Sequence, residues 1–437
     1  MSQTEVIPVP AARRLGWGLA ALVVAGNMIG SGVYLLPVTL APLGSSSLIG
    51  WAICGLGGLT LAAVFAGLGR FQPGADGLAD FTERGLGRFV GYQTSLFYWA
   101  ACLTGNVAVA VAGTGYLAFF FPILKEPWMG ALSNLAMIAI TTGAYAIGTR
   151  SAARFGAAML AIGLVPIALA AVAGVMAFSP ETFAASWRPG GAPLMQTVPA
   201  SLVVIFWAFL GVESAAALSA LVKDPARDVG RASLGGVGIA LIVYVAATVA
   251  VFGIIPANEL AASTSPYADL AARVLGASLG GLVAACAVLK AMGTIAGWTM
   301  LGGETARAAA EKGYLPRWFG GGGRGRPLSN PLINGAIMAT LIVATVQPSL
   351  AGQFGVLIQV CSVMTLMLYA LCSISLFRAC RSAGWRLLAV GGLVFSVGAV
   401  AVAAADYVLP VLVLFVATSV GWLIVRRRGV DRTPEPL

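Results

Sequence analysis

The chain is 437 residues long; 59% of its residues are hydrophobic, only 10% are charged, and its mean hydropathy is +0.91. A water-soluble protein of this length needs far more charge to cover its surface, so the composition excludes a soluble globular fold and favours a bundle of transmembrane helices. The chain has no His, and its six Cys show no CxxC spacing. We therefore expect free thiols in apolar surroundings, and neither a metal site, a disulfide framework nor a cofactor.

Twelve apolar segments follow one another along the sequence, most of them near the length that a helix needs to cross about 30 Å of hydrocarbon. The third is longer, which predicts that it is tilted or extends beyond the bilayer. Together they predict an all-α membrane protein with 12 transmembrane helices. The segments run over about 15–38, 46–69, 88–121, 127–148, 153–178, 197–221, 231–254, 278–303, 330–347, 353–377, 387–404 and 406–425.

The basic residues predict how these segments are oriented. With a cytoplasmic N-terminus, 22 of the 26 Lys and Arg fall in the even-numbered connectors and the two termini, on the cytoplasmic side. Only Lys125, Arg188 and Arg273 fall outside, and Lys290 lies within a segment. This bias is typical of a multi-pass protein of a bacterial inner membrane with both termini in the cytoplasm. It explains the net charge of +10 without nucleic acid as a partner, and the first segment is expected to be retained rather than cleaved as a leader.

Three segments contain glycines that are expected to interrupt a helix. The first contains Gly30-Ser31-Gly32 in mid-span, the sixth contains Gly211, and the eighth contains four glycines around Trp298. Backbone groups freed by a break are tolerated in hydrocarbon only where they face protein or a cavity. The alternative is that these glycines serve close packing between helices.

The first and sixth segments each open a run of five segments. Broken helices at matching positions of two halves predict a transporter of inverted repeats with its site at the midplane of the membrane. Its partners would be a small transported molecule and the membrane lipids. The predicted division is a cytoplasmic N-terminus over 1–14, a first five-helix repeat over 15–178, an inverted second repeat over 197–380, two C-terminal helices over 387–425 and a cytoplasmic tail over 426–437.

An unwound first helix would offer binding groups for an amino acid. The free amides of the half-helix that follows the break suit a carboxylate, and the carbonyls before it, from Asn27 to Ile29, suit an ammonium group. Trp207 and Trp298 lie in the other two interrupted segments. Indole faces attract cations and cover flat groups such as guanidinium, although packing alone is the alternative.

Polar and ionisable residues within the segments are further candidates. Tyr98, Cys102 and Asn106 follow one another at helical spacing in the third segment, where an amide needs either a ligand or a second helix as partner. Glu213 is expected to bind a proton, to gate the pathway or to pair with a cation, with a structural hydrogen bond as the alternative. Lys290 shares a helix face with Thr294. It could pair with Glu213, bind a substrate carboxylate, fill the position of a sodium ion in related transporters, titrate, or extend to the interface.

These residues lie in stretches that resemble the amino acid–polyamine–organocation superfamily, and within it the bacterial arginine/agmatine antiporters. The resemblance covers nearly the whole chain, and matches of this length and order are specific to the superfamily. The stretches are GNMIGSGVYLLP (26–37), GYQTSLFYWAACLTGN (91–106), FFFPILKEP (119–127), FWAFLGVESAAA (206–217), VKDPARDV (222–229), GWTMLGGETARAAAEKGYLP (297–316) and PLINGAIM (331–338).

The resemblance implies two inverted five-helix repeats plus two peripheral helices, a homodimer, and sodium-independent exchange by alternating access. It also implies roles for matching positions. Among the substrate-binding positions, Met28 would offer its main-chain carbonyl, and Ser31 and Gly32 would bind the carboxylate. Trp207 and Leu210 would cover the substrate and accept its ammonium. Ala101, Cys102 and Asn106 would lie at the guanidinium, Trp298 would stack on it, and Cys361 would lie near the substrate tail. The gating positions would be Tyr98 and Glu213, and Thr365 and Tyr369 would lie near the site. Together with Lys290 and Thr294, which were singled out above for their own chemistry, these are the predicted gating or proton-linked residues.

The chain departs from the family pattern at four places. The most notable are Ala79, where an acid-sensing Tyr is expected, and Lys290, which replaces a small residue, and the other two are Val109 in place of a Met and Cys361 in place of a Ser. A cation added to the core at Lys290 could repel a substrate with two positive groups, such as arginine, whereas the retained Asn106 and Trp298 favour it.

The predicted function is an antiporter that exchanges a cationic amino acid such as arginine for agmatine or another amino acid. One alternative is a proton-coupled permease or exporter of neutral amino acids in which Lys290 titrates. An alternative of another class is a membrane sensor of amino acids that transports nothing. An enzyme is not expected, since the sequence has no His, no metal motif and no pair of nucleophile and base.

Overall fold

The computed structural model describes residues 16–30, 34–75, 77–147, 165–213, 225–320 and 328–427, and within these ranges it contains helices and no strand. Eight of the helices are long and apolar enough to cross a membrane. Shorter apolar helices lie within the other four predicted segments. The prediction of an all-α membrane protein is therefore confirmed, and the boundaries of the long helices agree with the predicted segments to within several residues.

The elements follow the chain in a simple order. The N-terminal part contains α1 (Trp17–Met28), α2 (Leu36–Leu40), α3 (Ser47–Phe71), α4 (Leu78–Leu86), α5 (Arg88–Leu117), the 3₁₀ helix η3 (Pro122–Lys125), α6 (Pro127–Ile147) and α8 (Val165–Ala177). The next part contains α9 (Pro180–Ala185), α10 (Leu194–Phe206), the 3₁₀ helix η4 (Trp207–Phe209), α12 (Pro225–Ile254), α13 (Ala257–Ala262), α14 (Pro266–Leu275), α15 (Ala277–Glu311), the 3₁₀ helix η6 (Arg317–Phe319), α16 (Ser329–Ala344) and α17 (Leu350–Ala379). The last helices are α18 (Ala383–Ala401) and α19 (Ala405–Arg427).

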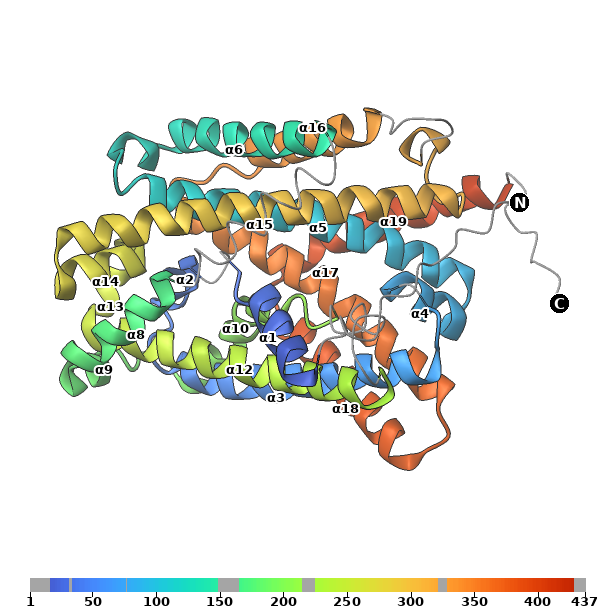
Figure 1. Ribbon diagram of the computed structural model, residues 1–437, viewed down its shortest axis with the longest axis horizontal. Helices are drawn as coiled ribbons and strands as arrows, with labels where there is room; N and C mark the ends of the chain where they lie inside the picture. The colour runs from blue at the N-terminus through green and yellow to red at the C-terminus, as the bar shows by residue number, and fades with distance from the viewer. Residues whose placement is uncertain are drawn as a thin grey trace.

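The long helices α5 and α15 pack against each other in the centre of the bundle, and α17 packs against α5 (Figure 1). On one side, α12 packs against α1 and α3, and on the other, α6 and α16 form an outer pair (Figure 1). Every residue of α5 from Ala101 to Tyr116 is buried. This helix is apolar and rich in Gly, Ala and Val, so its neighbours can approach it closely from all sides.

The first predicted segment is interrupted where the sequence indicates. α1 ends at Met28, and the Gly30 amide turns back to donate to the Met28 carbonyl at 2.6 Å. Regular helix resumes only at Leu36 in α2. The predicted interruption of the first helix is confirmed, although Ser31 and Gly32 lie outside the described residues.

The sixth segment is interrupted as well. α10 gives way to η4 at Trp207, and Leu210 then takes an extended conformation with ψ 137°. Gly211 follows with φ +98°, a left-handed conformation that other residues rarely adopt. The chain therefore leaves helical geometry near the middle of this segment, as predicted.

The predicted interruption of the eighth segment is wrong, because α15 is one continuous helix of 35 residues. Its glycines make room for neighbours instead. A Cβ at Gly303 would lie 2.3 Å from the Tyr145 hydroxyl, and one at Gly302 would lie 3.4 Å from Cβ of Cys102. The small size of these residues lets α5 and α6 pack closely on α15, which was the alternative reading of the sequence.

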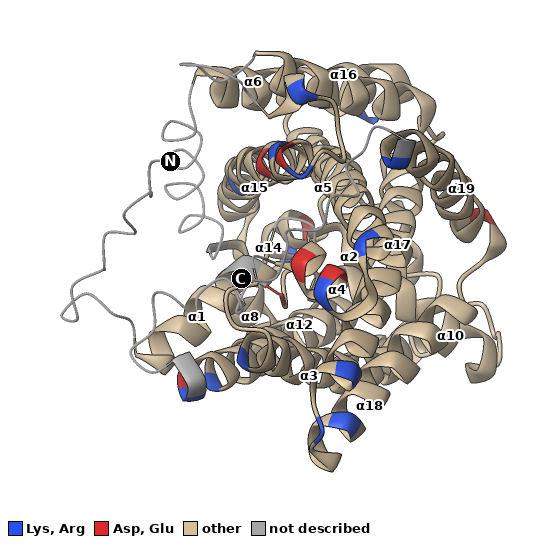
Figure 2. Ribbon diagram, turned by 90° about the vertical axis from the view of Figure 1, so that its right-hand side faces the viewer, with Lys and Arg blue, Asp and Glu red and all other residues tan. Residues whose placement is uncertain are grey.

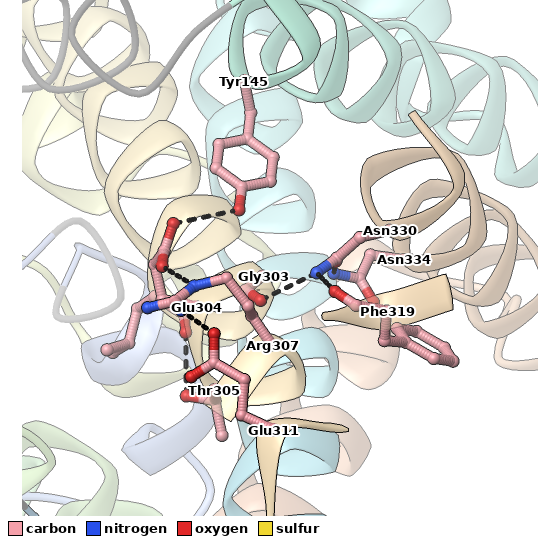
Figure 3. Close-up of polar contacts among 10 residues, drawn as sticks. Tyr145, Gly303, Glu304, Thr305, Arg307, Glu311, Phe319, Asn330 and Asn334 are labelled. Carbon is pink, nitrogen blue, oxygen red and sulfur yellow. Dashed lines mark hydrogen bonds and ion pairs between the residues drawn. The ribbon is translucent and has the colours of Figure 1, made fainter. Parts of the chain in front are cut away.

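Asparagines join α16 to the end of α15 (Figure 3). Asn330 donates to the carbonyl of Gly303 at 2.9 Å and to that of Phe319 at 3.1 Å. Asn334 donates to the side chain of Asn330 at 2.9 Å and accepts from the Trp99 indole of α5 at 3.0 Å. Hydrogen bonds between buried side chains of different helices stabilise packing where lipid gives no hydrophobic driving force.

One end of the bundle carries a cluster of ion pairs between α4 and the residue that follows α15, at the end seen in Figure 2. Lys312 bonds to Asp80 and, at 2.7 Å, to Glu83. Burial by itself lowers the pKa of Lys312, but the hydrogen bonds and charges of the two carboxylates outweigh burial and raise it above its ordinary 10.5. These bonds tie the connection between α3 and α5 to the end of α15.

Candidate functional site

Two tryptophans meet in the centre of the bundle. Trp207, at the interruption of the sixth segment, and Trp298 of α15 have ring centroids 5.8 Å apart and planes inclined by 52°. Phe354 of α17 presents its ring edge to Trp207 at 6.4 Å. The structure therefore brings together both predicted aromatic candidates.

Gly105 of α5 makes this arrangement possible. A Cβ at this position would lie 2.2 Å from Cζ3 of Trp298 and 3.3 Å from Cη2 of Trp207. Both indoles therefore reach the backbone of α5 only because residue 105 has no side chain. Gly105 is not among the residues predicted from the sequence. Its place between Cys102 and Asn106, in the middle of a continuous helix where Gly is unfavourable, was the available signal.

Glu213 accepts three hydrogen bonds. The Tyr98 hydroxyl of α5 donates to Oε1 at 3.0 Å, and the Tyr369 hydroxyl of α17 donates to Oε2. The amide of Gly211, in the same interruption, also donates to Oε2 at 3.1 Å. One carboxylate thus joins the interrupted sixth segment to two long helices, and it unites three of the predicted gating residues.

The predicted positions on α17 lie along one face toward α5. Cys361 donates from its thiol to the carbonyl of Ala101 at 3.3 Å, and Thr365 donates to the carbonyl of Cys361 at 2.9 Å. Tyr369 follows one turn later at Glu213. Because Tyr98, Cys102 and Asn106 follow one another with the same spacing on α5, the two helices present parallel polar stripes.

Asn106 is fully buried and bonds to α15. Its amide lies 3.2 Å from the Thr299 hydroxyl, and with its oxygen toward Thr299 its nitrogen can also donate to the Ile295 carbonyl at 3.3 Å. A second helix was one of the two partners predicted for this amide, and α15 is that helix. Thr299 was not singled out, since only the packing of α15 on α5 brings it to Asn106.

The backbone around the two interruptions supplies further polar groups. The Met28 carbonyl accepts one hydrogen bond, from Gly30, and a carbonyl oxygen has a second lone pair. Leu210 is extended and only 7% exposed, and its amide donates to the Trp207 carbonyl at 3.3 Å. The carboxylate-binding pair, Ser31 and Gly32, lies outside the described residues.

Lys290 does not pair with Glu213. The carboxylate is held by two phenols and an amide, and none of the ion pairs among the described residues includes Lys290. The ammonium does not extend to the interface either, because the residue is 1% exposed. Thr294, one turn further along α15, is half-buried.

None of the described residues forms a cluster of His, Cys, Asp and Glu that would hold a metal ion. The six cysteines are buried free thiols. What the centre offers is an aromatic pair, interrupted backbone and one carboxylate in hydrogen bonds. Aromatic faces with a few polar groups are typical of sites that bind small organic molecules.

Comparisons with known proteins identify the family of this chain. The model of the amino acid permease family matches residues 15–424. The chain is 32% identical over 373 residues to the cadaverine/lysine antiporter of Escherichia coli strain K12, which covers 84% of each chain. It is 30% identical over 346 residues to the putrescine transporter PotE of the same strain, which covers 79% of each, and 28% identical to the putrescine transporter PotE of Haemophilus influenzae.

The family match spans almost the whole chain and confirms the resemblance to the amino acid–polyamine–organocation superfamily. The relatives' names do not include arginine or agmatine, so that substrate pair stays a prediction. The chain belongs to the amino acid permease family, and it is a multi-pass membrane transporter and not an enzyme.

Proposed function

We propose that the protein exchanges amino acids or amines across the inner membrane by alternating access, with arginine as the leading substrate and agmatine or another amino acid as counter-substrate. The observation that carries this proposal is the pair of Trp207 and Trp298, which lies at the interruption of the sixth segment in a chain whose first segment is interrupted as well. Interrupted helices offer amides for a carboxylate and carbonyls for an ammonium, and the indoles suit a flat cationic side chain.

The proposed pose follows from these groups. The substrate carboxylate binds the amides of Ser31 and Gly32, and its ammonium binds the carbonyls of Met28 and Leu210. The side chain then extends along the polar stripe of α5. The guanidinium stacks on Trp298, with Trp207 covering the substrate, and reaches the group formed by Ala101, Cys102, Asn106 and Cys361.

Glu213, Tyr98 and Tyr369 are proposed as the gate, with Thr365 one turn from Tyr369. A carboxylate accepts from all three of its donors at once, whereas a protonated carboxyl group carries a donor on one oxygen. Protonation would thus loosen the joint between the sixth segment, α5 and α17. Ala79, in place of the family's acid-sensing Tyr, leaves Glu213 as the group through which acid would act.

The proposed topology has twelve crossings, with repeats over 15–178 and 197–380 and two further helices over 387–425. The helix in each of the twelve predicted segments supports it. Both termini are proposed to be cytoplasmic because of the distribution of Lys and Arg. A homodimer, which the family resemblance implies, can be tested by the mass of the protein in detergent.

The test is counterflow of radiolabelled arginine into proteoliposomes loaded with unlabelled arginine or agmatine. Uptake that requires an internal substrate and needs no sodium is expected. A second arm measures Trp298→Leu, which should raise KM for arginine about 2- to 30-fold, because loss of a cation–π contact costs about 0.5–2 kcal/mol. Trp128→Leu is the matched control, since Trp128 is 65% exposed on α6.

Uptake of a neutral amino acid without uptake of arginine would reject this proposal. That outcome would favour the second candidate, a proton-coupled permease or exporter of neutral amino acids. The buried Lys290 is the observation in its favour, because an ammonium buried in the transport core could carry the coupled proton. An unchanged pH dependence in Lys290→Gly would count against this second candidate.

A further inference from the structure

Lys290 is a buried cation for which the neighbouring helices provide no counter-charge. It is 1% exposed, and no hydrogen bond or ion pair among the described residues involves it. The helices α5, α6, α8 and α16, which pack on α15, contain no Asp or Glu. The acid of α14, Asp269, accepts from Ser263 and Ser265, and Glu213 is held by its phenols.

The position of Lys290 along α15 places it at the level of the interrupted first segment. Ala291, the next residue, packs against Gly113 of α5, where a Cβ would lie 2.9 Å from its own, and Tyr116, one turn further along α5, donates to the carbonyl of Tyr34, the first described residue after the interruption. Trp298 lies about 12 Å beyond Lys290 along the axis of α15, where it meets Trp207. Because helical side chains tilt toward the N-terminus of their helix, the ammonium of Lys290 leans toward the level of Tyr34.

The face of α15 that carries Lys290 leads from this level toward the tryptophans. Thr294 and Gly297 continue the same face and are both half-buried. No described atom lies within 4 Å of the place where a Cβ at Gly297 would be. The ammonium therefore stands at the level of one end of this face, and the aromatic pair stands at the level of the other.

We infer that Lys290 supplies the counter-charge for a substrate carboxylate, and so makes the carrier select amino acids over the amines that result when the carboxylate is lost. This inference rests on the proposed function and deepens it. It identifies the counter-substrate of arginine as another amino acid and not as agmatine.

The selectivity follows from charge balance in a place that excludes water. A buried ammonium without a partner is costly, and a substrate that brings a carboxylate to the same level lowers that cost. A diamine brings the same ammonium groups without the carboxylate, so their repulsion by the ammonium of Lys290 is not compensated. Like charges about 10 Å apart inside a protein repel strongly enough to change affinity by about an order of magnitude. Lysine and cadaverine differ only by the carboxylate, so their ratio isolates this effect.

The experiment measures how well lysine and cadaverine inhibit counterflow of radiolabelled arginine by the full chain in proteoliposomes. The wild type should prefer lysine at least tenfold. Lys290→Met, which keeps the length of the side chain and removes its charge, should reduce the ratio about tenfold, equivalent to about 1.4 kcal/mol. Lys290→Arg keeps the charge and should keep the preference.

Two outcomes would overturn the inference. One is a wild type that binds cadaverine as well as lysine, which needs no variant and so does not depend on how a variant folds. The other is an active Lys290→Met protein with the wild-type ratio. If arginine itself is not transported, the proposed substrate fails, and the inference about Lys290 is then tested with leucine and isoamylamine, which also differ by one carboxylate.

Discussion

Two clusters of tyrosines lie on opposite sides of the tryptophan pair. One consists of Tyr98 and Tyr369 around the carboxylate of Glu213, and the other contains no charged residue. Along α5, Tyr98 lies about 10 Å before Gly105 and Tyr116 lies about 16 Å after it. Tyr98 donates to the carboxylate of Glu213, whereas Tyr116 donates to the carbonyl of Tyr34 at 3.0 Å. The two ends of the site are therefore closed by chemically different contacts.

The uncharged cluster consists of Tyr34, Tyr116 and Tyr267, all of which are at most 1% exposed. Tyr116 also accepts from the Tyr267 amide at 3.4 Å, and the ring of Tyr34 lies 5.6 Å and 6.0 Å from the other two. Phenols and carbonyls keep the same protonation state near neutral pH, whereas a carboxylate can take up a proton. Alternating access needs both ends to open, and we expect the contacts of Glu213 to respond to acid and those among the three tyrosines to stay unchanged.

The largest effect is expected from Glu213→Gln, which removes the charge that distinguishes the two ends. The amide keeps one accepting oxygen but turns an NH₂ group toward donors, so at least one buried donor loses its partner at a cost of about 1–3 kcal/mol. Exchange should fall at least tenfold, and the remaining activity should no longer depend on pH. The measurement is arginine counterflow between pH 5.5 and 8.

Tyr98→Phe and Tyr369→Phe are the controls for Glu213→Gln, since each removes one donor and leaves the carboxylate in place. Each should cost less than Glu213→Gln and should retain a response to acid. Wild-type counterflow and pH dependence in Glu213→Gln would show that the carboxylate is only a structural hydrogen-bond acceptor.

The two ends also show which features of the site could be predicted from the sequence. Glu213, Tyr98 and Tyr369 could be named as candidates, but their mutual bonds could not, since 115 and 156 residues separate the phenols from the carboxylate. The interruption at Gly211 was predictable because its conformation is local. The role of the α15 glycines was not, because Gly303 shows its purpose only when Tyr145 of α6 packs against it. Gly105 was missed for the same reason.

An effect of intermediate size is expected at the end formed by Tyr34, Tyr116 and Tyr267. Tyr116→Phe removes the hydroxyl that donates to the Tyr34 carbonyl and accepts from Tyr267, and a buried hydrogen bond contributes about 1 kcal/mol. The thermal midpoint in detergent should fall, and exchange should change by the same factor at pH 5.5 and pH 8. An effect confined to acid pH would contradict an uncharged role for this end, and Tyr407→Phe on α19 is a comparison outside both clusters.

The smallest effect is expected from Lys312→Met, at the same end as Glu213 but outside the membrane-spanning part. Its bonds to Asp80 and Glu83 are partly exposed and screened by salt, so their loss should lower stability by less than about 1 kcal/mol. Because the pKa of Lys312 is raised in the folded state, its contribution is complete below the ordinary value of 10.5 and disappears as the pH rises through the higher folded value. The difference in thermal midpoint between wild type and Lys312→Met should therefore be present at pH 8, shrink in 1 M salt and vanish at strongly alkaline pH. A difference that survives salt and alkali would mean that the side chain acts by packing, and then the charges at this end would not help to hold it closed.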